Sequence, residues 1–323
     1  MRSRRFTRLL LLGALLGHGG LVPAIEAKIR IRLGSVAPRD AAWHGALLRI
    51  RQEWREISGG EVDVVIIPGG QLGDGPEMVR KVDRGIIQAV ALSQVGLSRI
   101  DNGVACLHVP MLLESYEELD YVRERIAPRL EQRLEEQGFK VLTWGDAGWV
   151  RFFSTAPART PDDVRKMKLF TSAGDPDGEK LWKEFGFRVI PLSLTDMLTS
   201  LQTGLINAFH VPPLFAMIDG SYKLAKNMLD LKFSPIVAGT VISRRAWNRI
   251  PEAYRPRMLE AARSAGDALR EEIRRLGPDS IEEMKKRGLK VAKLDERERA
   301  LWRAEAEEAY PKLKGRYVPA GLF

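Results

Sequence analysis

Apolar and polar positions in the first part of the chain alternate between the period of a strand and that of a helix. Residues 28–36 alternate basic and apolar side chains, as strands do, and residues 41–57 carry apolar side chains at helical spacing. The same reading predicts a strand over 61–67, a helix over 78–85 and a buried strand over 86–92. This order favours a parallel sheet whose strands are joined by crossover helices.

The rest of the chain continues with shorter elements. Strands are expected over 140–145, 168–171, 188–191, 205–209 and 232–243, and helices over 115–137, 178–185, 251–286 and 302–310. Thr160, followed by Pro161, is expected to cap a further helix, and a helix beginning at Ser193 or Thr195 is expected to end at Gly204. No low-complexity linker divides the chain. We therefore expect an α/β protein with two lobes joined by crossing strands.

The first 27 residues have the pattern of a secretory signal peptide. Four arginines precede the apolar run 9–16, and the small residue Ala27 precedes Lys28. The run is shorter than the roughly 20 apolar residues that span a bilayer, which disfavours the alternative of an uncleaved anchor. We expect cleavage after Ala27 or, because Ile25 is not small, after Ala24. The mature protein would then lie in the periplasm.

Length, charge and cysteine content further limit the number of domains and the kind of protein that the sequence can encode. Removal of 27 residues from 323 leaves 296, which suggests two domains at roughly 100–200 residues each. Cys106 is the only cysteine, so an internal disulfide is impossible. The formal charge of +9 falls to +6 without residues 1–27, which carry four arginines and one glutamate. The other basic residues are interleaved with acids along helices, and this pattern argues against nucleic acid binding.

Motifs of common catalytic sites are absent from the sequence. The four histidines, at positions 18, 44, 108 and 210, have no HExxH spacing. There is no GxSxG elbow, no GxxxxGK[ST] loop and no GxGxxG after a predicted strand. The run GDPDGE at 174–179 is too short and irregular for a calcium loop. We therefore expect a protein without catalytic residues, metal or cofactor.

Three short segments occur in order within this pattern. They are PGGQLG at 68–73, TPDDVRKMK at 160–168 and LQTG at 201–204, with Pro212 beyond the last. Together they resemble the solute-binding proteins of TRAP transporters (tripartite ATP-independent periplasmic transporters), the DctP-like family, which carries TPEDLKGLK and LQTG segments at these places. The resemblance extends from about Ile29 to the C-terminal helices.

The resemblance implies a two-lobed periplasmic-binding-protein fold with a ligand cleft between the lobes. Lobe I is expected at 28–148 plus 233–275 and lobe II at 149–232 plus 276–323, joined by crossing strands and a long helix. The implied function is capture of a small organic solute by hinge closure and its delivery to TRAP membrane permease subunits. A sensor that signals to a membrane receptor and a periplasmic enzyme are the alternatives. A monomer is expected, with a dimer as the alternative.

One position departs from the family in a way that bears on the ligand. The resemblance implies an arginine that pairs with the carboxylate of the usual organic acid, and this chain has Phe170 there. Either another cation, such as Arg151, replaces it, or the ligand is less anionic and more apolar. We favour the second, because the expected cleft lining is rich in aromatic residues. These are Trp149, Phe152, Phe170, Phe209 and Phe233.

The other candidate ligand contacts lie at the ends of predicted strands, where cleft residues gather in α/β proteins, or in the glycine-rich turn. They are Ser93, Gln94, Asn207, His210 and, in the turn, Gln71. Each has a structural alternative: Asn207 can satisfy backbone groups, and His210 can be a hydrogen-bonded loop residue. Asp175 is interpreted as a helix cap, and Trp43 as packing on its own helix.

Overall fold

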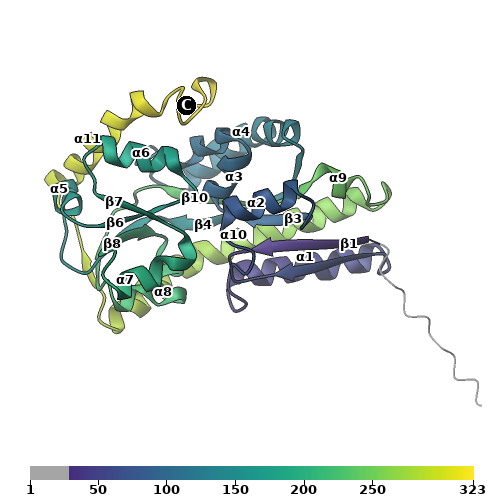
Figure 1. The fold of residues 1–323 in the computed structure, drawn as a ribbon, viewed down its shortest axis with the longest axis horizontal. Coiled ribbons are helices and arrows are strands. Elements are labelled where there is room, and N and C mark those ends of the chain that lie inside the picture. The colour runs from purple at the N-terminus through teal and green to yellow at the C-terminus, as the bar shows by residue number, and fades with distance from the viewer. Residues whose placement is uncertain (1–28) are drawn as a thin grey trace, which may run out of the picture.

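The computed structural model describes residues 29–323, so the expected signal peptide lies outside the described residues. Two sheets, A and B, organise this part of the chain (Figure 1). Sheet A has the strand order β2 (Val62–Ile67), β1 (Ile29–Ser35), β3 (Ala89–Leu92), β10 (Pro235–Ser243) and β4 (Phe139–Trp149). Sheet B has the order β11 (Lys290–Ala292), β9 (Asn227–Leu229), β5 (Arg151–Ser154), β8 (Ala208–Val211), β6 (Leu169–Ser172) and β7 (Val189–Leu192).

Sheet A is mixed and not wholly parallel. Strand β1 pairs in parallel with β2 and β3, as the strand–helix alternation predicted. Strand β10 runs antiparallel to both β3 and β4. The predicted parallel arrangement is therefore confirmed for β1, β2 and β3. No direction was predicted for β10, which enters sheet A directly from sheet B and not through a crossover helix.

Helices cover both faces of sheet A. The helices α1 (Ala42–Ile57) and α10 (Arg255–Lys286) pack on one face, where Leu47, Ile50 and Trp54 meet Met258 and Ala262. The other face is covered by α2 (Gly75–Asp83), α3 (Gln94–Ile100), the 3-10 helix η1 (Asn102–His108) and α4 (Tyr116–Glu136). The apolar side chains of α1 recur at helical spacing because they form the stripe that faces this core.

Sheet B is sandwiched in the same way. Its first face packs against α5 (Pro161–Arg165), α6 (Pro176–Glu184) and α11 (Glu296–Leu313). The second face packs against α7 (Met197–Gln202), α8 (Pro213–Asp219) and the end of α10. The shorter elements η2 (Leu194–Asp196), η3 (Ser221–Lys223), α9 (Arg244–Trp247) and η4 (Ala320–Leu322) complete the described chain.

Three connections join the two sheets. Only Val150 separates β4 of sheet A from β5 of sheet B, and the segment 230–234 joins β9 to β10. Helix α10 passes from one core to the other (Figure 1), because Met258 lies in the core of sheet A and Met284 in that of sheet B. Helix α11 likewise contributes Trp302 to the core of sheet B and Leu313 to a cluster with η1 and α4.

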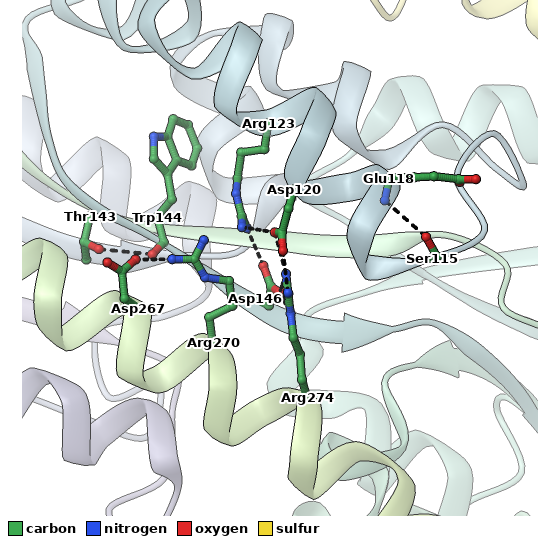
Figure 2. Close-up of polar contacts among 10 residues, drawn as sticks. All are labelled: Ser115, Glu118, Asp120, Arg123, Thr143, Trp144, Asp146, Asp267, Arg270 and Arg274. Carbon is green, nitrogen blue, oxygen red and sulfur yellow. Dashed lines mark hydrogen bonds and ion pairs between the residues drawn. The ribbon is translucent and has the colours of Figure 1, made fainter.

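An ionic network fastens β4 close to this crossing (Figure 2). Asp146 of β4 is 1% exposed and accepts hydrogen bonds from Arg123 of α4 at 2.7 Å and from Arg274 of α10 at 2.8 Å. Asp120 of α4 bonds to both arginines, at 2.6 Å in the case of Arg274 Nη1. The hydrogen bond from Arg274 is the main reason that the pKa of Asp120 is lowered. The network therefore ties a strand to two helices.

Two helix caps form where the sequence predicted them, whereas several short elements were not predicted. Thr160 caps α5 in a capping box with Asp163, and Asp175 caps α6 by accepting from Gly178 N, as predicted. Strand β8 begins three residues later than the predicted strand over 205–209, and α3, α8, α9, β5, β9 and β11 were not predicted. Among residues 29–323, no helix has the length and apolar character needed to cross a membrane.

Candidate functional site

A cavity of about 480 Å³ lies between the two sheets. Its walls come from both sides. The sheet A side contributes, among others, Trp43, Pro76, Met78, Ser93, Gln94 and Ile236, and the sheet B side Phe170–Ser172, Trp182 and His210–Pro212. The crossing segments add Val150 and Phe233. The volume falls within the roughly 300–1,000 Å³ range of small-molecule sites. The cavity therefore has the size and position expected for a ligand held between lobes.

Five of the eleven residues predicted to line the cleft or contact the ligand lie in the wall of this cavity. They are Ser93, Gln94, Phe170, His210 and Phe233. Ser93 and Gln94 sit there because β3 ends at Leu92 and α3 starts at Gln94, which turns the chain at the cavity wall. Phe170 and His210 come from the neighbouring strands β6 and β8. The structure thus brings together residues from segments that are well separated in the sequence.

The other six predicted residues lie away from the cavity wall. Asn207 accepts a hydrogen bond from Lys168 N at 2.7 Å, and Phe209 is fully buried and stacks on Phe153. Gln71 is exposed in the glycine-rich turn. Trp149, Phe152 and Arg151 are buried beside the crossing of the sheets and do not line the cavity.

Arg151 was the candidate in the less favoured alternative, in which another cation replaces the missing arginine. Its side chain is buried, and its nearest carboxylate is that of Asp230, at 3.9 Å. Burial lowers the pKa of its guanidinium, and Asp230 partly opposes this effect. Because Arg151 does not line the cavity, it does not place a guanidinium beside Phe170 in the cavity wall.

The cavity wall also includes residues that were not proposed as ligand contacts from the sequence, and four of them are important for the argument below. They are Trp43, His108, Trp182 and Tyr317. Trp43 was assigned to its own helix, but its indole Nε1 donates to Asp146 O at 3.2 Å and its ring lines the cavity. Tyr317 comes from the C-terminal segment beyond α11, which no sequence pattern connected with the cleft. Trp182 lies on α6, and a helical tryptophan alone does not distinguish a core residue from a site residue.

Aromatic rings form a continuous part of the wall. Trp182 stacks near Phe233, with ring centroids 5.6 Å apart and planes at 23°, and lies 5.3 Å from the ring of His210. Phe170 is 6.4 Å from His210 on the other side. These four residues present ring faces and edges to the cavity, which suits an apolar or aromatic molecule.

The histidines of the cavity are held in defined tautomers. His108 Nδ1 lies 2.7 Å from Pro235 O; because a carbonyl only accepts, Nδ1 carries the proton. His210 Nε2 is buried without a partner, so the ring bonds to the Phe170 backbone through Nδ1. Burial lowers the pKa of both rings, to about 4 for His210. Both histidines are therefore neutral near neutral pH.

The lowered pKa of His210 predicts a specific pH dependence of stability. The folded state holds this pKa at about 4, below the ordinary value of 6.5, so the unfolded chain binds more protons between these values. Stability should fall as the pH drops from about 6.5 to about 4, on the order of 3 kcal/mol from this residue. Urea denaturation across this pH range measures the free energy of unfolding of the wild type and of His210→Asn. Carboxylate groups contribute equally to both proteins, so the difference between the two curves reports the contribution of His210. Parallel curves for the two proteins would contradict the prediction.

The two sides touch each other at the edge of the cavity. A side-chain carbon placed on Gly174 would clash with the ring of Pro76, and one placed on Gly70 would come within 2.9 Å of Thr195 Cγ2. Gly174 and Thr195 belong to the sheet B side, whereas Pro76 and Gly70 belong to the sheet A side. At each glycine a side chain of the opposite side therefore packs where a Cβ would lie, and the two sides are in direct contact.

Comparison with known proteins places this geometry in a family. The sequence model described as bacterial extracellular solute-binding protein, family 7 (DctP), matches residues 33–315. The ectoine-binding periplasmic protein TeaA of Halomonas elongata is 23% identical over 224 residues, 67% of this chain and 64% of the relative. The sialic acid-binding periplasmic protein SiaP of Vibrio cholerae is 19% identical over 278 residues, 83% and 84% of the two chains.

Solved structures give the same result for the fold. A TRAP periplasmic solute-binding protein from Desulfovibrio salexigens with bound orotic acid superposes with a TM-score of 0.82 at 22% identity, covering 89% of this chain and 92% of that one. One from Sulfurospirillum deleyianum with bound succinate gives 0.84 at 18% identity, covering 92% and 97%. These similarities confirm the predicted two-lobed α/β fold with its cavity between the lobes.

Proposed function

Because the chain belongs to family 7 of the bacterial extracellular solute-binding proteins, we propose that it captures a small organic solute in the cavity between its lobes and delivers it to TRAP permease subunits. The hinge would be the crossing between the sheets, where β4 passes into β5 and β9 leads into β10. No chemical change of the solute is needed for this role, so the protein acts as a binding protein and not as an enzyme.

We place the mature protein in the periplasm, where relatives such as TeaA and SiaP are described. The signal-like pattern of residues 1–27 supports this location. The proposed division into lobe I (28–148 plus 233–275) and lobe II (149–232 plus 276–323) is supported by the sheets, because nearly all strand residues of sheets A and B fall in the corresponding ranges.

The ligand is proposed to be less anionic and more apolar than a typical sugar acid or dicarboxylate. The observation that carries this proposal is Phe170, which is 4% exposed and lines the cavity where the family resemblance implies an arginine. Among the described cavity residues the one arginine is Arg99, whose side chain is exposed. A buried carboxylate without a paired cation costs several kcal/mol, so an acid of the usual kind fits this wall poorly.

Native mass spectrometry of the mature protein as purified, followed by denaturing extraction, tests the proposal. We expect a co-purifying compound that is apolar or neutral and is released on denaturation. The variant Phe170→Arg should gain affinity for succinate by about tenfold or more, because a hydrogen bond to a charged group contributes roughly 1.5–3 kcal/mol. Circular dichroism verifies that the variant is folded. A tightly bound small carboxylic acid in the wild type would contradict the proposed ligand class.

A further inference from the structure

The polar groups at one end of the cavity are hydrogen-bond acceptors. His108 donates through Nδ1 to Pro235 O, which leaves the lone pair of Nε2. His210 is bonded to the Phe170 backbone, and its Nε2 is buried with no partner. The two rings are close enough to interact electrostatically, and both line the cavity. A neutral histidine offers one donor and one acceptor, so each ring has only an acceptor left for a ligand.

A carboxylate adds a third acceptor beside the histidines. Asp175 lies within electrostatic range of His108, and its Oδ1 accepts from Gly178 N at 2.9 Å. Within residues 29–323 the Gly178 contact is the one hydrogen bond of the Asp175 carboxylate, and Asp175 forms no ion pair there. A carboxylate has about four acceptor positions, of which the cap uses one. Asp175 therefore lines the cavity with acceptor capacity that no other described residue uses.

Other polar groups near this end carry no positive charge. Tyr317 is 7% exposed, lies within electrostatic range of Asp175, and has a buried hydroxyl without a partner. Gln94 uses its amide nitrogen on Ser98 Oγ at 3.4 Å. Each of these can make a neutral hydrogen bond with a ligand. Neither can compensate a ligand's negative charge, and Asp175 would repel it.

We propose that His108, His210 and Asp175 select a ligand whose polar group donates hydrogen bonds and carries no negative charge, an amine or a hydroxyl group on an apolar body. This inference rests on the proposed function, because it names the ligand class of the same cavity. An ammonium group has three donors for these acceptors, and the rings of Phe170, Trp182 and Phe233 offer faces that attract a cation. A carboxylate ligand would place its acceptor oxygens against the acceptor nitrogens of the histidines, and its negative charge beside that of Asp175.

Three probes that share one apolar body and differ in their polar group test which group the cavity prefers. They are phenethylamine, phenethyl alcohol and phenylacetate. Calorimetric titration of the protein after removal of any co-purified compound should show the amine and the alcohol binding at least about tenfold more tightly than phenylacetate. Asp175→Asn should weaken the amine by about tenfold and change the alcohol less, since asparagine keeps an oxygen for the helix cap and removes the charge.

The matched control is Asp295→Asn, the same change at the cap of α11, where Asp295 accepts from Glu298 N and does not line the cavity. It should leave all three affinities unchanged. Tightest binding of phenylacetate, or an unchanged amine affinity in Asp175→Asn, would overturn the inference while leaving solute binding intact. If no probe binds and no compound co-purifies, the proposed function fails together with it.

Discussion

Replacing Asp146 with alanine should lower the free energy of unfolding by about 3–5 kcal/mol, the usual cost of removing one partner of a buried ion pair. Asp146 is 1% exposed and receives hydrogen bonds from two arginines that come from different helices (Figure 2). Its loss would leave Arg123, itself 3% exposed, with Asp120 as its remaining charged partner. Two positive charges would then share one carboxylate in a poorly solvated position.

Urea denaturation followed by circular dichroism measures this effect. The matched control is Asp267→Ala, which removes a carboxylate from the same helix α10 that carries Arg274 (Figure 2). Asp267 pairs with Arg270 on the surface, with its side chain 64% exposed, and such pairs contribute about 0–1 kcal/mol. A loss of stability in Asp146→Ala no larger than that of the control would show that the network is not important for the fold.

The positions of strands and helices were predictable where an element buries an apolar stripe or face that shows as a period in its own sequence. Strands β1 and β2 and helices α1 and α4 appear close to where the hydrophobic pattern placed them. Short elements such as β9 and β11, of three residues each, carry too few positions to show a period. The antiparallel direction of β10 was not predictable, because it depends on the path of the chain between the sheets, and no local sequence pattern indicates that path.

The ionic network also depends on residues far apart in sequence. Asp146 meets Arg123 from 23 positions away and Arg274 from 128 positions away. Each of these residues alone resembles an ordinary surface charge. Only the packing of α4 and α10 against β4 brings them together, so the sequence could not indicate a buried network here.

Only some of the predicted site residues line the cavity. For the two residues predicted on β8, strand geometry explains why one lines it and the other does not. Phe209 and His210 are neighbours on β8, and neighbouring strand residues point to opposite faces. His210 lines the cavity, whereas Phe209 packs in the core behind it. Predicting both as ligand contacts was inconsistent with this alternation. His108 was missed because it ends a 3-10 helix that the pattern did not show.

Replacing Gly174 with alanine should weaken ligand binding by about 5–150-fold. The added methyl group would clash with Cγ of Pro76 on the opposite side of the cavity. Overpacking costs typically 1–3 kcal/mol, and here it would oppose only the state in which the two sides touch. Since the ligand must stabilise that state, the cost appears as lost affinity. Stability of each lobe should change little, because the clash lies between lobes and not within either core.

A second substitution distinguishes this steric effect from direct damage to the site. Pro76→Ala removes Cγ and Cδ, and leaves Cβ, which lies 3.3 Å from the carbon added at position 174. Pro76 occupies the first turn of α2, where alanine is compatible with the helix. Affinity for the compound released from the wild type, measured by calorimetry, should therefore recover in Gly174→Ala/Pro76→Ala. Gly277→Ala, with open space around the added carbon, is the control. Failure of the double variant to recover would mean that Gly174 acts on the ligand directly and that contact between the lobes does not limit binding.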